Sequence, residues 1–336
     1  APPPHVAAPP AAGEVPPDAQ AQINGVRRSP ANNTRKLLAA LAPLMDLGLS
    51  EQEAIARGFG RFPVGGYATF SHDWLFPRFT PSFHLHEGTD IFATRGTPVR
   101  APAAGTLKLA QGGSGGLAVY IYEPNGTYYY MAHLDSFAPD LVQGQPVALG
   151  QVVGTVGDSG NAKGGAPHVH FEIHPAPSRT VITGKGKNRT VTTVPRSVPV
   201  GTVLPPIDPK AHLDQWLRDA LADVSRVIAS VEARPRALQA TGLTRRLGTG
   251  TAGGFPGPVS PSRDQLLWVS SASPSGGALR LAEAEAMMAA NDFDWSLAAR
   301  RRQARLEELA EAQARVEALL RPLTPSALQS LPAVPD

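Results

Sequence analysis

The stretch AVYIYEPNGTYYYM, residues 118–131, places an Asn-Gly pair at residues 125–126 between two apolar and aromatic runs. Asn-Gly favours the tight turn that joins two antiparallel strands, and Val, Ile and Tyr favour extended backbone. Similar short runs, separated by Gly and Pro, extend from Phe62 to about Val203. We therefore expect a mainly antiparallel β domain at residues 61–204, a sheet or sandwich with a groove.

Helical patterns flank this β segment, so the chain is predicted to belong to the α+β class. Residues 34–60 are predicted to form short helices, the second of which begins with a capping box between Ser50 and Glu53. Residues 205–240 are predicted to form one helix with an apolar face. That face consists of Leu213, Trp216, Leu217, Ala220, Leu221 and Val224.

The C-terminal region, residues 277–336, is predicted to be helical and amphipathic. Its apolar residues near heptad spacing are Leu306, Leu309, Val316 and Leu320. Two segments rich in Pro, Ala or Gly cannot form a packed core. We expect residues 1–33 to be a disordered tether and residues 241–276 to be a linker.

The composition excludes several classes of function. The chain has no cysteine, so a metal would have to be bound by His, Asp or Glu. Its net charge is +3 without a dense run of Lys or Arg, so we expect no nucleic-acid partner. No apolar run approaches the roughly 18 residues that cross a bilayer, and the N-terminus lacks the features of a signal peptide. We expect no transmembrane segment and no signal peptide in this chain.

Three of the nine histidines lie in HVHFEIH, residues 168–174. Successive side chains of a strand point to opposite faces. One face of this predicted strand carries His168, His170, Glu172 and His174, and the other carries Val169, Phe171 and Ile173. The apolar face would anchor the strand in the core, which gives the polar face the rigidity that a metal site needs.

A second group of candidate ligands lies in HEGTD, residues 86–90. Gly88 and Thr89 disfavour a helix, and in an extended segment His86 and Asp90 point the same way. The helical zinc motif HExxH is not met, because Asp90 takes its fifth position. These two side chains and one His of HVHFEIH give three ligands, the number that a catalytic zinc uses while keeping a position open. The two segments together predict a zinc site.

The chain resembles the lysostaphin and LytM type of zinc metallopeptidases, the duplicated hybrid motif family. The resemblance covers about residues 62–175, roughly a third of the chain, and rests on five blocks in the same order. The blocks are FPV (62–64), HEGTDIFATRGTPVRAPAAGTL (86–107), YMAHL (130–134), GQVVGTVGDSGN (150–161) and PHVHFEIHP (167–175).

This resemblance implies a LytM-like β fold that binds one zinc ion and hydrolyses peptide bonds in bacterial peptidoglycan. The matching positions imply that His86, Asp90 and His170 bind the zinc, and that His133 and His168 act in catalysis. Either of these last two could be the general base. The implied place of action is the cell envelope or the outside of a bacterial cell.

Other side chains receive smaller assignments. Glu172 is predicted either to orient a ligand or to face solvent. Arg78 could be the arginine that ends a turn of the family's groove, although SHDWLFPRF, which contains His72, departs from the family pattern there. His84 is expected at the surface, and His174 and His212 are given no role. The glycine-rich turns at residues 112–116 and 157–167 are predicted to form walls of the cleft, beside Tyr130.

Three functions remain open at this point. The first is an active zinc endopeptidase acting on peptidoglycan peptides. The second is a non-catalytic scaffold that activates another wall hydrolase, and a complete set of ligands disfavours it. The third is a metallopeptidase acting on some other peptide. The flanking helices are predicted either to bind another envelope protein or to shield the cleft.

Overall fold

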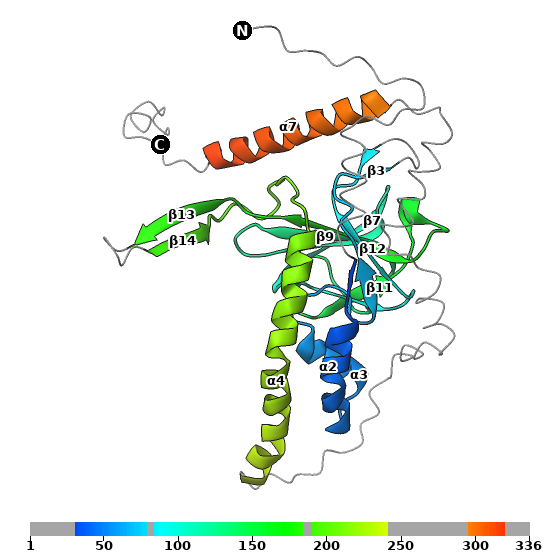
Figure 1. Ribbon diagram of the computed structural model, residues 1–336, viewed down its shortest axis with the longest axis vertical. Coiled ribbons are helices and arrows are strands. Elements are labelled where there is room, and N and C mark those ends of the chain that lie inside the picture. The colour runs from blue at the N-terminus through cyan, green and yellow to red at the C-terminus, as the bar shows by residue number, and fades with distance from the viewer. Residues whose placement is uncertain (1–30, 79–83, 184–189, 241–294, 320–336) are drawn as a thin grey trace, which may run out of the picture.

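The computed structural model describes residues 31–78, 84–183, 190–240 and 295–319. Within these residues, a ten-stranded sheet forms the body of the molecule and helices lie on both sides of it (Figure 1). Its strands pair antiparallel, which confirms the predicted α+β class and mainly antiparallel sheet. Residues 1–30 of the predicted tether, the predicted linker, and both the start (277–294) and the end (320–336, which includes Leu320) of the C-terminal region lie outside the described residues, whereas Asn32 and Asn33 at the end of the predicted tether form a strand of the main sheet.

The strand order of the main sheet is β1-β2-β5-β12-β9-β8-β7-β10, and β11 pairs with both β6 and β9. Its strands are β1 (Asn32–Asn33), β2 (Ala68–Phe70), β5 (Thr89–Ala93), β6 (Pro98–Arg100), β7 (Gly105–Gly112), β8 (Gly116–Tyr122), β9 (Tyr128–Phe137), β10 (Pro146–Val147), β11 (Val152–Val156) and β12 (His168–His174). Two hairpins lie outside it, β3 (Pro77–Arg78) with β4 (His84–Leu85) and β13 (Ser178–Thr183) with β14 (Thr190–Pro195). The predicted hairpin is β8–β9, in which Tyr122 pairs with Tyr128.

Three helices cover one side of the sheet: α2 (Arg35–Asp46), α3 (Glu51–Gly58) and α4 (Lys210–Ala240) (Figure 1). The apolar face of β12 is buried on this side, as predicted. Trp216 of α4 packs against Phe171 of β12 and Tyr129 of β9, with ring centroids 6.0 and 6.1 Å apart. The three helices and the sheet therefore share one hydrophobic core.

Two predictions about these helices can be compared with the structure. The capping box is confirmed, because Ser50 accepts a hydrogen bond from the backbone N–H of Glu53 while the Glu53 carboxylate accepts one from the backbone N–H of Ser50. The apolar face of α4 was predicted one residue too wide. Leu221 is 40% exposed, because it lies at the edge of the stripe that buries Leu217 and Val224.

The opposite side of the sheet carries the histidine face of β12 and the helix α7 (Trp295–Leu319) (Figure 1). Tyr128 of β9 stacks on His174 of β12, with ring centroids 4.1 Å apart. A second apolar cluster on this side consists of Tyr122, Tyr128, Ala176, Val198, Leu204 and Val316 of α7. Among the described residues, none of the helices combines the length and hydropathy needed to cross a bilayer.

Candidate metal centre

The fold brings two distant segments together at one point of the sheet. Asp90 of β5 lies directly opposite His170 of β12 in the antiparallel register. His86 precedes β5, and its backbone is fixed by two hydrogen bonds. Its carbonyl accepts from the N–H of Leu75 at 2.6 Å, and its N–H donates to the carbonyl of Phe76 at 3.0 Å. A rigid backbone therefore carries each of the three side chains.

One ligand atom from each of these side chains faces a common centre. The His86 Nε2 atom lies 3.0 Å from Asp90 Oδ1 and 2.8 Å from His170 Nδ1, and the last two atoms are 3.3 Å apart. Four ligands arranged tetrahedrally around zinc at about 2.0–2.1 Å would be separated by roughly 3.3 Å. The three donor atoms are therefore as close together as shared coordination requires.

A hydrogen bond on its far side orients each of these three groups. The His86 Nδ1–H donates to the Asp73 carbonyl at 3.0 Å. Arg78 Nη2 donates to Asp90 Oδ2 at 2.7 Å, and the other oxygen, Oδ1, faces the two imidazoles. The His170 Nε2–H donates to Glu172 at 2.8 Å. Such outer partners fix the tautomer and the direction of a metal ligand.

The charges around the centre favour a cation. Burial and the nearby Arg78 lower the pKa of His86 to about 3, so its ring is neutral and can bind a metal. Burial alone would raise the pKa of Asp90, but His86 and Arg78 hold it well below its ordinary value. Burial alone would lower the pKa of His170, but hydrogen bonds to Asp90 and Glu172 raise it to about 10. His170 Nδ1 therefore holds either a proton or a metal ion, and a metal has to displace the proton.

The sequence left two alternatives for Glu172, which could orient a ligand or face solvent, and it gave no role to His174. Its carboxylate accepts from His170 at one oxygen and from His174 Nε2 at the other, at 2.6 Å. His174 is fixed in turn by the Leu204 carbonyl, 2.6 Å from its Nδ1. Burial alone would raise the pKa of Glu172, but the two histidines lower it to about 2. Glu172 therefore orients a candidate ligand, and His174, to which no role was assigned, supports Glu172.

Arg78 and Asp73 form a buried pair beneath the centre. Arg78 Nη2 lies 3.1 Å from Asp73 Oδ2, and both side chains are almost fully buried. Burial and the neighbouring Asp90 raise the pKa of Asp73 to about 8. Arg78 thus contacts a candidate ligand. Although the segment SHDWLFPRF departs from the family pattern, its arginine lies beside Asp90. His72 of the same segment pairs with Asp208 instead.

His133 reaches the centre through an irregularity in β9. Tyr129 packs on the core side and Tyr130 lies 6.1 Å from His170 by ring centroids, so simple alternation would turn residue 133 toward the core. The register between β8 and β9 shifts at this point, and His133 has a φ of 64°. A β-bulge re-aims the side chain that it carries. The His133 ring consequently lies 5.0 Å from that of His168 and 6.0 Å from that of His170.

His133 and His168 present the same ring atom to the centre. The Nδ1–H of His133 donates to the Ser159 carbonyl, and that of His168 donates to the Ala166 carbonyl, both at 2.8 Å. A carbonyl oxygen can only accept, so Nδ1 carries the proton and the Nε2 atom of the neutral ring can accept one. The His168 Nε2 atom is 3.8 Å from Asp90 Oδ1. Burial, with His168 and His170, lowers the pKa of His133 to about 4, so its ring is neutral at pH 7.

Glycines make room around these rings. A Cβ atom on Gly88 would lie 2.6 Å from the Phe171 carbonyl and 2.7 Å from His170 Cε1. Gly115 faces the Tyr130 hydroxyl in the same way, and its carbonyl accepts from the His133 N–H at 2.9 Å. The two glycine-rich turns also contact each other, because the Asn161 N–H donates to the Ser114 carbonyl at 2.9 Å. They border the side of the site that holds His133.

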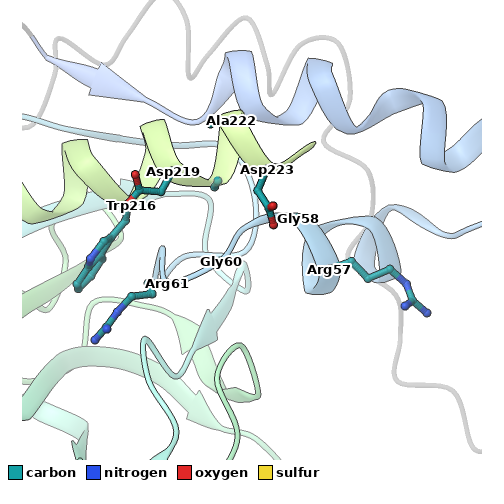
Figure 2. Close-up of a pocket in the computed structure, with 9 residues that line it drawn as sticks. Arg57, Gly58, Gly60, Arg61, Trp216, Asp219, Ala222 and Asp223 are labelled. Carbon is teal, nitrogen blue, oxygen red and sulfur yellow. The ribbon is translucent and has the colours of Figure 1, made fainter. Parts of the chain in front are cut away.

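A pocket of about 460 Å³ lies elsewhere, between the end of α3 and α4 (Figure 2). Arg57, Arg61, Trp216 and Asp223 are among the residues that line it. Trp216 packs on the face of β12 opposite to His170, so the sheet separates this pocket from the metal centre. Two further histidines of the described residues are peripheral: His84 is exposed on β4, and His212 is exposed on α4.

Comparisons with known proteins found a family model and several relatives that match part of the chain. Residues 84–184 match the model of Peptidase family M23. An L-Ala--D-Glu endopeptidase of Bacillus subtilis is 33% identical over 147 residues, which are 39% of this chain and 45% of the relative. A DD-carboxypeptidase/endopeptidase Mpg of Neisseria meningitidis is 44% identical over 93 residues, 27% of this chain and 20% of the relative. These alignments span less than half of either relative's own length.

Among solved structures, the catalytic domain of lysostaphin from Staphylococcus simulans is similar. The match has 27% sequence identity and a TM-score of 0.26, and it covers 39% of this chain and 80% of the lysostaphin domain.

Proposed function

We propose that the protein is a zinc-dependent endopeptidase that hydrolyses peptide bonds of bacterial peptidoglycan, because residues 84–184 match the model of Peptidase family M23. The observation that carries this proposal is the convergence of His86, Asp90 and His170, each with an outer partner that aims its ligand atom. A further relative, the Peptidoglycan DD-endopeptidase ShyC of Vibrio cholerae, supports the choice of substrate; it is 30% identical over 128 residues, which are 32% of this chain and 27% of the relative.

In this proposal, these three residues hold a single zinc ion. A zinc ion held there would act as a Lewis acid, which would polarise a peptide carbonyl and lower the pKa of its bound water to about 7. The donor set fits, because it offers two imidazole nitrogens and one carboxylate oxygen and lacks thiolates. Arg78 and Glu172 keep the ligands in place by binding their outer atoms.

His133 and His168 perform the proton transfers. Amide hydrolysis needs a base that takes a proton from water and an acid that gives one to the leaving amine. The Nε2 atom of either ring can accept the proton, because each Nδ1–H is already bound to a carbonyl. The same Nε2–H, once formed, can stabilise a developing oxyanion or donate to the amine nitrogen.

The proposal also covers the substrate and the place where the protein acts. The substrate is a peptide of the cell wall, and the protein acts in the cell envelope or outside the cell. The complete set of candidate ligands and both catalytic histidines favour this enzyme over a non-catalytic activator of another hydrolase. Action on a different extracellular peptide would use the same residues.

Digestion of purified peptidoglycan tests the proposal. We expect the zinc-loaded protein to release muropeptides that mass spectrometry identifies, and to lose this activity after chelation or with His170→Ala. His84→Ala, at an exposed histidine outside the centre, is the matched control and should remain active. If the protein binds about one zinc ion and leaves every wall preparation intact, the hypothesis of an endopeptidase is rejected in favour of a non-catalytic activator.

A further inference from the structure

The turn at residues 157–161 holds both of the histidines to which proton transfer is assigned. The Ser159 carbonyl accepts the hydrogen bond from His133 Nδ1–H at 2.8 Å. The Gly157 carbonyl accepts the one from the His168 backbone N–H at 2.9 Å. One short piece of backbone therefore fixes the ring of the first histidine and the main chain of the second.

His133 depends on outside contacts, because its own backbone is strained. Its φ of 64° lies in the left-handed region, which costs free energy and persists only where the surrounding structure holds it. Its N–H donates to the Gly115 carbonyl at 2.9 Å, and its ring donates to Ser159. The chain just beyond it packs closely on the turn, since a Cβ atom on Gly157 would lie 2.3 Å from the Asp135 nitrogen. The place of the His133 ring thus follows from how β9 and the turn are joined.

Arg95 joins these two segments through its side chain. Its Nη1 atom donates to the Asp135 carboxylate, and its Nη2 atom binds the Asp158 carboxylate at 2.7 Å. Asp135 is two residues beyond His133 on β9, and Asp158 directly precedes Ser159 in the turn. The hydrogen bond from Arg95 lowers the pKa of Asp158, so that this carboxylate is ionised at neutral pH. One guanidinium therefore binds a carboxylate on each side of the His133 contact.

The backbone that carries Arg95 is itself fixed. Arg95 lies in the turn after β5, five residues beyond the candidate ligand Asp90. The Gly96 N–H donates to the Val156 carbonyl at 2.9 Å, and the Val156 N–H donates to the Thr97 carbonyl at 2.8 Å. These bonds attach the turn after β5 to the end of β11. Arg95 therefore has a rigid base from which to hold both carboxylates.

We propose that Arg95 is a positioning residue for His133, because it holds the strand that carries this histidine against the turn that binds its ring. The inference rests on the proposed function, since the step it serves is the proton transfer assigned to His133. Both ion pairs are partly exposed, and 45% of the Arg95 side chain is accessible to solvent. The bridge therefore contributes little to overall stability, and its loss acts on the local geometry.

Steady-state kinetics of the full chain on a soluble wall peptide give the first test. We expect Arg95→Ala to lower kcat roughly three- to tenfold at an unchanged KM, because two solvent-screened ion pairs are lost. Arg95→Lys should recover part of this loss, since an ammonium group can still bind a carboxylate. Arg226→Ala is the matched control and should behave like the wild type, because Arg226 forms an exposed pair with Asp223 within α4.

A second readout does not depend on activity. Proton–nitrogen NMR spectra of the histidine rings in the zinc-loaded full chain report which ring nitrogen carries the proton, and His133→Ala identifies the signal of His133. We expect a single Nδ1–H tautomer in the wild type and in Arg226→Ala. Arg95→Ala should give a mixture of tautomers, because the Ser159 carbonyl no longer holds the Nδ1–H in place. The zinc content and the melting temperature of Arg95→Ala should match those of the wild type.

The two readouts separate the two proposals. An unchanged His133 tautomer in Arg95→Ala would overturn the positioning role, whether or not the protein cuts peptidoglycan. A rise in KM alone would also overturn it and would assign Arg95 to substrate binding. A melting temperature far below that of the wild type would overturn it too, because Arg95 would then support the whole fold. A changed tautomer in a protein that binds zinc but cuts no wall peptide would support the positioning of His133 and reject the proposed function.

Discussion

At the scale of single residues, the three candidate ligands depend on neighbouring groups outside the candidate ligand set. Glu172, Arg78 and the Asp73 carbonyl each bind the outer atom of one ligand. Removing such a partner leaves the ligand present but free to rotate or to change tautomer. Metal affinity should therefore be sensitive to these positions.

We expect Glu172→Gln to weaken zinc binding 10- to 100-fold, about the range seen for outer partners of metal ligands. The amide cannot match the charge of the carboxylate that holds the His170 Nε2–H. Competition with a chromophoric chelator measures the change. Glu232→Gln, at an exposed glutamate of α4, is the control and should bind zinc like the wild type. Equal affinities in both variants would show that Glu172 does not orient His170.

His133 should affect catalysis without affecting the metal. We expect His133→Ala to keep its zinc and to lower kcat about 10²- to 10⁴-fold, the contribution typical of a positioned acid or base. Zinc content by mass spectrometry of metals and kcat on a wall peptide are the two measurements. If the variant lost its zinc as readily as His170→Ala, His133 would have to be regarded as a ligand.

Sequence patterns predicted the residues of the centre unequally. Asp90 and the HxH pair could be predicted because alternation along a strand places their side chains on one face, and His86, which precedes β5, was predicted from its spacing to Asp90. His133 followed from the family resemblance alone, because a bulge reverses the direction that alternation gives to residue 133. His174 was overlooked, since the network Leu204–His174–Glu172–His170 joins groups whose proximity depends on the tertiary fold.

At the scale of elements, the start of α4 is connected to the loop after β2. Asp208 accepts a hydrogen bond from the Lys210 backbone N–H at 2.9 Å and also pairs with His72 at 2.6 Å. The bond to Asp208 raises the pKa of His72, although burial opposes it. Burial alone would raise the pKa of Asp208, but His72 lowers it. The pair therefore joins the helix to the segment that leads to Asp73 and Arg78.

The signs of these shifts define a pH window. His72 contributes stability fully below its unfolded pKa of about 6.5, and this contribution is lost as the pH rises through the raised folded value. Asp208 contributes above its unfolded pKa of about 3.9, and its contribution is lost as the pH falls through the lowered folded value. The pair should stabilise α4 most between about pH 4 and 6.5.

We expect His72→Gln to lower the free energy of unfolding more at pH 5.5 than at pH 8.5. The difference should be less than about 1 kcal/mol, because both groups are about one third exposed and solvent screens their attraction. Denaturant titrations at the two pH values measure it. A larger destabilisation at pH 8.5 would contradict the assigned pair.

At the scale of the whole molecule, α4 belongs to the same core as the sheet. Leu213, Trp216 and Leu217 are buried together with Phe171 of β12, the strand that carries His170. The composition of the strands and the helical spacing of α4 predicted both elements. Their packing against each other, and the docking of α7 on the opposite face, depend on contacts between residues far apart in the sequence, which periodicity does not encode. The division of the chain into domains remains a prediction.

We expect Trp216→Ala to lower the free energy of unfolding by about 3–5 kcal/mol, because the ring fills space against Phe171 and Tyr129. Leu221→Ala, on the same helix but 40% exposed, should cost less than about 1 kcal/mol. Urea denaturation of both variants measures the difference. Similar small losses in the two variants would show that α4 is not part of the core.

Because α4 shares the core with the sheet, removing the chain after Thr202 would expose that core rather than isolate an intact catalytic unit.

Anomalous X-ray diffraction at the zinc absorption edge, from crystals of the zinc-loaded protein, tests the assignment of the metal site most directly. We expect a single strong peak within bonding distance of His86 Nε2, Asp90 Oδ1 and His170 Nδ1, and no peak in crystals of His170→Ala. A zinc ion bound elsewhere, or a map without a peak among these three atoms, would contradict it.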